Sequence, residues 1–468
     1  MSIVFCGICP HPPVMVPEVG QGRDNEVANT KKAMLELGRR LSESDAETLV
    51  MISPHGTVFS DGIGINAEKE LSGNLGQFNA PGVRFALAND LALVQKIQNK
   101  ARLQNITVAG IDSTLARRYG VTTGLDHGIM APLYFLRQAG VHIPLVHVSM
   151  GLLPFYQLYS FGVALREAAG ELNKHVAVLA SSDLSHRLTL DAPNGYHPAG
   201  KEFDHRLVKL VRVGDVEGIC GLDPELAEQA GECGLRSIIM MLGALDGVEI
   251  TSEVLSYEGP FGVGYLVASL VPGARDEQRR LQDKIRRLVL DRAGQKRTAE
   301  SYPVQLARRV LENYYHGGRD EFKPQEVPEE FAGRRAGVFV SLKKHGRLRG
   351  CIGTIAPTKN NIAEEIAENA VSAAIRDPRF YPVKPEELPE LDISVDILGE
   401  PEPVHGLDEL DPHKYGVIVS AGGRRGLLLP DLEGIDTVDE QVAIARQKAG
   451  ISPGEKVRLE RFEVVRYH

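Results

Sequence analysis

The sequence predicts an α/β N-terminal domain with a central parallel or mixed sheet, followed by an α+β domain. In residues 1–272, short apolar runs alternate with amphipathic helical patterns, an order typical of a sheet covered by helices. A charged segment at 273–297 interrupts this alternation, and the helices and strands after it follow no regular order. We therefore expect domains at 1–272 and 298–468, joined by a charged linker helix at 273–297.

The length and composition narrow the class of protein. A chain of 468 residues is too long to fold around a single hydrophobic core of ordinary size. Its 43% hydrophobic and 25% charged residues are typical of a globular protein. The net charge of −9 favours neither nucleic acid nor a membrane surface as a partner. No apolar stretch reaches the ~20 residues that cross a bilayer and no secretion signal is evident, so we expect a cytoplasmic location. The sequence allows a homo-oligomer without specifying one.

The expected strands are short apolar runs bounded by turn residues, and the expected helices repeat apolar residues at three- and four-residue spacing. In the N-terminal domain the strands lie at 2–9, 47–53, 105–110, 143–149, 175–181 and 248–256. The helices there lie near 25–43, 89–102, 127–139, 155–172, 199–212 and 233–246. In the C-terminal domain we expect helices at 303–315, 361–374 and 437–448, and strands at 337–342, 391–398, 416–420 and 426–429.

Two histidines follow apolar runs in the N-terminal domain, and each stands next to a proline. His11 follows the first run and His55 follows the second. Because ligands bind at the carboxyl ends of strands in open α/β sheets, these imidazoles could hold a divalent metal there. Glu232, just before an apolar helix, would complete a two-histidine, one-carboxylate set, which suits Fe(II) and leaves coordination positions open. Alternatively, Glu232 caps the N-terminus of that helix.

Two further histidines stand where proton transfer is needed. His186 closes a strand-to-loop junction and His127 opens a helix. An imidazole titrates near neutrality, so it can remove a proton from a substrate and later return one. The remaining histidines of this domain lack such a setting, and we expect packing or surface roles for His142, His147, His175, His197 and His205.

Five motifs carry a family resemblance and occur in order along the N-terminal domain: His11-Pro12-Pro13, Ser53-Pro54-His55-Gly56, Asp126-His127-Gly128, Ser181-Ser182-Asp183-Leu184-Ser185-His186 and Phe203-Asp204. With them the domain resembles the class III extradiol dioxygenases of the LigB type and the related Memo family. The resemblance implies Fe(II) held by His11, His55 and Glu232, with His127 and His186 as catalytic histidines. It also implies that dioxygen opens the ring of a small catechol or aminophenol-like aromatic, with His186 as base and then acid.

Two alternatives stay open beside this interpretation. In Memo-type proteins a cysteine takes the third ligand position, and Cys233 directly follows Glu232. A thiolate would favour copper or zinc, and the protein would then be a redox or interaction protein without ring cleavage. Zinc-assisted hydrolysis with His186 as the base is the other alternative. We prefer Glu232 because the histidine set resembles that of the dioxygenases; aromatic residues that could line a substrate pocket are Phe78, Phe85, Tyr196 and Phe261.

The C-terminal domain resembles the AMMECR domain, and the order of the two domains resembles that of the A-type proteins of the AmmeMemoRadiSam system. The matching motifs are Leu348-Arg349-Gly350-Cys351-Ile352-Gly353-Thr354, Arg376-Asp377-Pro378-Arg379-Phe380, Leu391-Asp392-Ile393-Ser394-Val395, Gly426-Leu427-Leu428-Leu429-Pro430 and Lys448-Ala449-Gly450-Ile451. Cys351 is either a nucleophilic or redox thiol activated by arginine, or a small buried residue in a tight turn. An anion site would form if the nearby arginines converge, namely Arg347, Arg349, Arg376 and Arg379.

Overall fold

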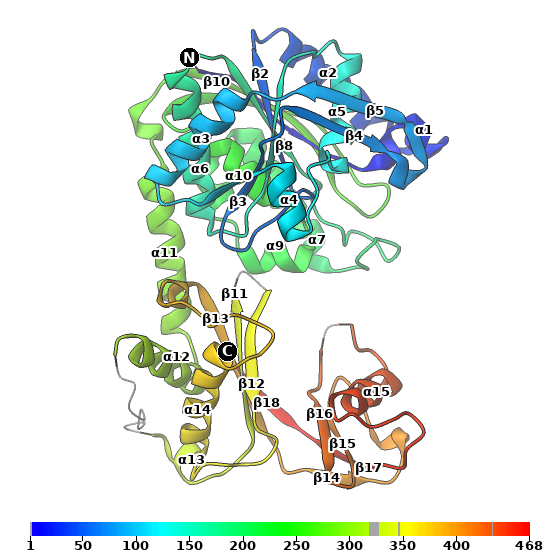
Figure 1. Ribbon diagram of the computed structural model, residues 1–468, viewed down its shortest axis with the longest axis vertical. Coiled ribbons are helices and arrows are strands. Elements are labelled where there is room, and N and C mark those ends of the chain that lie inside the picture. The colour runs from blue at the N-terminus through cyan, green and yellow to red at the C-terminus, as the bar shows by residue number, and fades with distance from the viewer. Residues whose placement is uncertain (1, 318–326, 345–346, 433) are drawn as a thin grey trace. The chain divides into compact units, whose positions relative to one another are not determined.

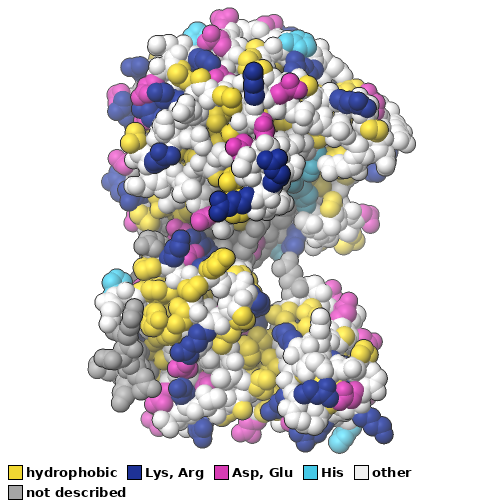
Figure 2. All heavy atoms as spheres, viewed as in Figure 1, with side chains coloured by type: hydrophobic (Ala, Val, Ile, Leu, Met, Phe, Trp, Pro, Cys, Tyr) yellow, Lys and Arg dark blue, Asp and Glu magenta, His cyan; other side chains and the backbone are white. Residues whose placement is uncertain are grey.

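The computed structural model describes residues 2–317, 327–344, 347–432 and 434–468, and the chain forms two compact units, Met1–Arg292 and Ala293–His468 (Figure 1). No helix in the described part of the chain is long and apolar enough to cross a membrane. On the face drawn in Figure 2, the Lys and Arg side chains of unit 1 are interspersed with Asp and Glu side chains.

Unit 1 is built on an eight-stranded mixed sheet with the order β6-β3-β7-β2-β8-β1-β10-β9. These strands are β1 (Ile3–Cys9), β2 (Thr48–Ser53), β3 (Ile63–Asn66), β6 (Val108–Ile111), β7 (Leu145–Ser149), β8 (Val176–Ser181), β9 (Val248–Glu258) and β10 (Tyr265–Arg275). The central strands β7, β2, β8 and β1 run parallel, whereas β10 is antiparallel to β1 and β9 is antiparallel to β10. The predicted α/β class with a parallel or mixed sheet is therefore confirmed.

Helices cover both faces of this sheet. On β8, Val178 and Ala180 face one core while Ala177 and Leu179 face the other, so a continuous apolar run serves two layers. One core packs against α3 (Leu91–Leu103), α6 (Phe155–Glu171), α7 (Pro198–Val213) and α10 (Leu235–Gly243). The other packs against α2 (Ala28–Ser42), α5 (His127–Gln138) and the hairpin of β4 (Glu70–Leu75) and β5 (Ala80–Ala88). Shorter helices are α1 (Pro17–Gly20), α4 (Ser113–Tyr119), α8 (Val216–Cys220) and α9 (Pro224–Ala230).

Each strand and helix expected in this half of the chain corresponds to an element of the structure, but four strands were not expected. Three of them are short or interrupted by glycine or proline, namely β3, β4 and β5. The fourth, β10, forms the edge hairpin with β9. The segment 273–297 also differs from a fully solvated linker. Its start belongs to β10, α11 begins at Gln282 and runs to Thr298, and Ile285 is buried against unit 1.

Unit 2 contains two four-stranded sheets, with orders β12-β11-β13-β18 and β14-β17-β15-β16. Their strands are β11 (Val338–Lys344), β12 (Arg347–Gly353), β13 (Leu391–Leu398), β14 (Glu402–Val404), β15 (Gly416–Ala421), β16 (Arg424–Leu428), β17 (Arg458–Phe462) and β18 (Val464–Tyr467). The helices are α12 (Tyr302–Tyr315), α13 (Glu329–Ala332), α14 (Ile362–Ile375) and α15 (Val438–Lys448). The first sheet packs one face on α12 and α14, which agrees with the predicted α+β class.

Candidate metal centre

The sheet order brings the first two histidines together. His11 lies two residues after β1 and His55 lies two residues after β2, and both strands pair in parallel with β8. Their following loops therefore meet at one edge of the sheet. Cys233 reaches the same edge from the turn before α10, which packs on β8 and β2. Gly234 permits this approach, because a Cβ at that position would lie 2.2 Å from the Cβ of Ser182.

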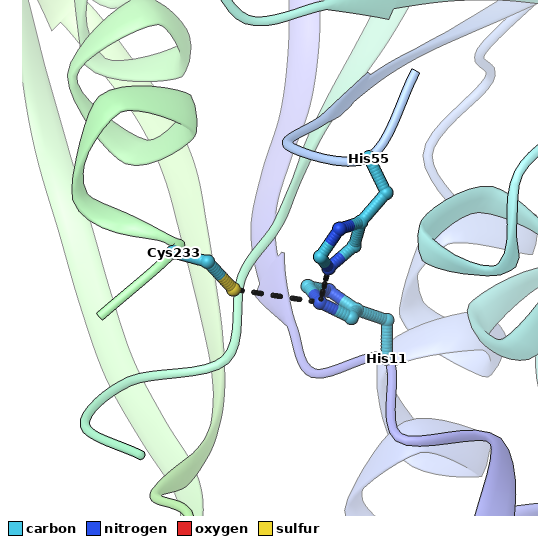
Figure 3. A group of neighbouring side chains, drawn as sticks. All are labelled: His11, His55 and Cys233. Carbon is cyan, nitrogen blue, oxygen red and sulfur yellow. Dashed lines mark hydrogen bonds between the residues drawn. The ribbon is translucent and has the colours of Figure 1, made fainter. Parts of the chain in front are cut away.

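His11, His55 and Cys233 form one group whose ligand atoms all lie within 4.8 Å of one another (Figure 3). The Nε2 atoms of the two histidines are 2.9 Å apart, and the sulfur of Cys233 is 3.6 Å from Nε2 of His11. Ligands bound at ~2.1 Å (nitrogen) and ~2.3 Å (sulfur) lie about 3.0–3.6 Å apart around one ion. The donor set and the two distances to Nε2 of His11 therefore fit a single metal ion. It is the one such group found in the described part of the chain.

The surroundings of His11 leave its Nε2 available for a metal. Ser181 donates its hydroxyl proton to the carbonyl of Gly128, so its oxygen accepts a hydrogen bond from Nδ1 of His11 at 2.8 Å. This partner fixes the tautomer that carries a lone pair on Nε2. Burial, followed by the charge of His127, lowers the pKa of His11 to about 3. The imidazole is therefore neutral at pH 7, as a metal ligand must be.

His55 shares the lowered pKa of His11, whereas the thiol of Cys233 has a raised pKa. Desolvation, followed by the charges of His11 and His127, lowers the pKa of His55, although the residue as a whole is exposed. Burial raises the pKa of the Cys233 thiol, and the carboxyl groups of Asp183 and Glu232 add to the effect. The cysteine is therefore a thiol without metal, and it must release a proton to bind one.

Glu232 does not join this group. Its Oε2 accepts a hydrogen bond of 2.6 Å from the backbone N–H of Leu235 in the first turn of α10. Burial raises the pKa of this carboxyl to about 7. The structure thus gives Glu232 the helix-capping position that the sequence left open, and it brings Cys233 to the two histidines.

His127 lies against this group, and His186 is near enough to affect the pKa of His11. His127 is the first residue of α5, and its ring stacks on that of His55 with centroids 4.2 Å apart. Burial lowers its pKa. His186 is half-buried after β8, and its charge is among the smaller contributions to the lowered pKa of His11. Nδ1 of His186 has no hydrogen-bond partner in the described part of the chain.

Two buried carboxylates beside the centre were not assigned a role from the sequence. Oδ1 of Asp183 accepts a hydrogen bond from the backbone N–H of His11 at 2.8 Å, and burial raises its pKa to about 6. Asp126 accepts a hydrogen bond from Ser53 at 2.6 Å and lies 3.0 Å from Nε2 of His147. Burial opposes the ionisation of Asp126, but His147 and Ser53 outweigh burial and hold its pKa below the ordinary value. Both residues belong to motifs that contain a site histidine, and this is the sequence signal that could have indicated a role for them.

Of the four aromatic residues proposed to line a pocket, Phe78 contacts a site histidine, with its ring centroid 5.4 Å from that of His127. Phe85 and Phe261 pack instead against the core under α2 and α5. Tyr196 is 48% exposed. Phe78 is therefore the aromatic of this set that the structure places beside the centre.

In unit 2 the structure brings Arg379, but not Arg349 or Arg376, to Cys351. The half-buried Cys351 donates its N–H to Asp377 at 2.8 Å, and Arg379 donates to the carbonyl of Cys351 at 3.1 Å. Arg379 also pairs with Asp377 at 2.7 Å. The other described arginines pair elsewhere, Arg349 with Glu387 and Arg376 with Glu368. The side chain of Arg347 lies outside the described residues.

With this geometry in hand, comparisons with known proteins identify the family. Residues 6–268 match the family described as the catalytic LigB subunit of aromatic ring-opening dioxygenase. The chain belongs to this LigB family. Residues 304–468 match the AMMECR1 family, so the LigB domain is followed by an AMMECR1 domain.

One relative matches this chain along its whole given length. A protein of Clostridium acetobutylicum is 42% identical over 468 residues, covering 100% of this chain and 99% of its own. A Thermotoga maritima protein is 57% identical over 166 residues, covering 35% of this chain and 95% of its own. A crystal structure from Escherichia coli is 17% identical with a TM-score of 0.38, and the match covers 57% of this chain and 99% of that one.

Proposed function

We propose that unit 1 is a metal-dependent oxidoreductase of the dioxygenase type, with Fe(II) held by His11, His55 and Cys233. Its substrates would be dioxygen and a small aromatic carrying two adjacent hydroxyl groups, or a hydroxyl and an amino group. The observation that carries the proposal is the convergence of three ligand atoms within 4.8 Å in a LigB-family domain, with His127 stacked on one ligand.

The roles of the side chains follow from their protonation and contacts. A redox-active metal at these ligands would supply Lewis acidity toward a substrate oxygen and electrons for dioxygen chemistry. His127, whose pKa is lowered by burial, is neutral at pH 7 and can accept a proton from a substrate hydroxyl. His186 has an Nδ1 atom free of any hydrogen bond to the described residues, so it can take up a proton and return it to the product. Phe78 packs beside His127 and offers an apolar surface for an aromatic ring.

One observation favours a second candidate function. The third atom of the group that could bind a metal is a sulfur rather than a carboxylate oxygen. A thiolate with two imidazoles suits copper or zinc better than a carboxylate with two imidazoles does. Under this second proposal the centre carries out electron transfer or interaction with a partner, and no aromatic ring is opened.

Oxygen uptake tests the first proposal. The full chain is loaded anaerobically with Fe(II), bound iron is measured, and catechols and aminophenols are added while oxygen and product absorbance are recorded. We expect uptake with at least one compound, slowed by about 10²–10⁴-fold in His186→Ala without loss of iron. His205→Ala, at an exposed histidine, is the control and should match the wild type. An iron-loaded protein that consumes no oxygen across the panel would overturn ring opening.

Metal analysis of variants tests the ligand assignment. Cys233→Ala should lose the metal, whereas Glu232→Ala should keep it because that carboxylate binds a backbone N–H. Cys351→Ala removes a half-buried cysteine of unit 2 and serves as the matched control. If Glu232→Ala loses the metal and Cys233→Ala keeps it, the carboxylate is the ligand. If copper or zinc binds more tightly than iron through Cys233 and no oxygen is consumed, the second candidate function replaces the first.

A further inference from the structure

Asp126 lies where the loop that carries His55 meets the helix that carries His127. It is the N-cap residue of α5, directly before His127. Its Oδ1 accepts a hydrogen bond of 2.6 Å from the hydroxyl of Ser53, and that hydroxyl accepts one of 3.2 Å from the backbone N–H of His55. One carboxylate therefore connects the two segments that present a metal ligand and the stacked histidine.

His147 lies next to the other oxygen of this carboxylate. It lies on β7 beside Met51 of β2, and it is 5% exposed. Its Nε2 is 3.0 Å from Oδ2 of Asp126. The same nitrogen lies under the loop of His55, since a Cβ at Gly56 would be only 3.1 Å from it. His147 therefore contacts both Asp126 and the backbone next to His55.

Ser53 and the first turn of α5 are closely packed. A Cβ at Gly128 would lie 2.4 Å from the hydroxyl oxygen of Ser53 and 2.8 Å from Oδ1 of Asp126. Only glycine fits at this position, so the first turn of α5 begins in direct contact with the end of β2. A shift of Asp126 would then move His127 relative to His55.

We propose that Asp126 and His147 are positioning residues for the metal centre, and that together they hold His55 in place to bind the ion and His127 stacked on it. Neither residue touches the ion or the substrate; each acts through the histidines. This inference rests on the proposed function, since it assumes that His55 is a metal ligand. It assigns a role to His147, for which the sequence indicated only packing.

The test measures binding of Co(II) alone to the full chain by absorption titration, where bands from cobalt–thiolate and cobalt–histidine bonds report the ligands. Loss of a residue that orients a metal ligand typically costs 10–100-fold in affinity. We expect His147→Leu and Asp126→Asn to raise the Kd for Co(II) by about that factor. His147→Gln should stay close to the wild type, because its amide N–H can still face Asp126.

Asp90→Asn is the matched control. Asp90 is also a buried N-cap carboxylate, and it binds Thr48 at the opposite end of β2. Its loss should lower the thermal unfolding temperature without changing the Kd for Co(II). Should His147→Leu fail to fold, Asp126→Asn and His147→Gln decide the test.

The outcomes separate this inference from the proposed function. A wild-type chain that binds no Co(II) through its histidines would contradict the proposed function itself. A wild type that binds Co(II), with His147→Leu and Asp126→Asn binding it equally well, would overturn the positioning role alone. Asp90→Asn weakening Co(II) binding as much as Asp126→Asn would also overturn it, because general destabilisation would then explain the effect.

Discussion

The two units each place a half-buried cysteine near a buried carboxylate, but they use the surrounding donors differently. Around Cys233, Nε2 of His11 faces both Nε2 of His55 and the sulfur. Around Cys351, the arginine that reaches the cysteine is already paired, since Arg379 binds Asp377. Grouping of reactive residue types is therefore not enough to make a site. The donor atoms must also remain available to bind a ligand.

The largest effect is expected from a substitution that removes a proposed metal ligand of unit 1. His11→Ala removes a ligand that is 1% exposed and held by Ser181 and Asp183. We expect the Kd for Zn(II) to rise by more than the ~100-fold that loss of an orienting residue costs. His175→Ala, outside both sites, should leave the Kd unchanged. Isothermal titration of both variants checks this. An unchanged affinity for Zn(II) in His11→Ala would contradict the assignment of His11 as a metal ligand.

The pH dependence of metal binding sharpens the contrast between Cys233 and Glu232. Because burial raises the pKa of the Cys233 thiol well above its ordinary value, binding at neutral pH must release its proton. Higher pH therefore favours binding, and the affinity for Zn(II) should rise about tenfold per pH unit between pH 7 and 8.5. If Glu232 were the ligand, the rise would level off above pH 7, since its pKa is about 7. Competition titrations with a chelator of known affinity distinguish the two slopes.

A smaller effect is expected in unit 2, where Asp377 holds the backbone N–H of Cys351 and the guanidinium of Arg379. Asp377→Asn should destabilise unit 2 by about 1–3 kcal/mol, because a buried hydrogen-bonded carboxylate is lost. Arg379 holds the pKa of Asp377 at about 2, so this stabilisation is present above the ordinary value and is lost as pH falls toward 2. Urea unfolding measures the change; a simultaneous loss of metal affinity would contradict the separation of the two sites.

The smallest expected effect concerns Arg376, which pairs with Glu368 on the surface. Exposed ion pairs contribute about 0–1 kcal/mol, so Arg376→Ala should change the free energy of unfolding by less than that. The thiol of Cys351 should also react with iodoacetamide at the wild-type rate, because Arg376 pairs with Glu368 rather than with Cys351. A clear change in that rate would return Arg376 to the site that the sequence predicted for it.

The convergence of His11 and His55 was predictable, whereas the choice of third ligand was not. Both histidines follow strands of one parallel sheet, and the carboxyl ends of such strands share an edge. Glu232 and Cys233 are neighbours in one turn, so the sequence pattern does not show which of the two side chains faces the histidines. Their directions are decided by the backbone N–H of Leu235, which takes the carboxylate.

Other features depend on contacts that no local pattern reports. His147 stands in an apolar run and resembles a core residue until β7 is known to lie beside β2. The sequence of the edge strand β12 is typical of a turn, because it contains Gly350. That glycine is required by packing, because a Cβ there would lie 2.1 Å from the carbonyl oxygen of Ala373 on α14.

The two ends of the centre are far apart in the chain, since Cys233 and His11 are separated by 222 positions. A nascent polypeptide cannot assemble this trio until nearly all of unit 1 has emerged and its sheet has closed. Metal binding at this centre therefore follows the folding of unit 1 and does not nucleate it.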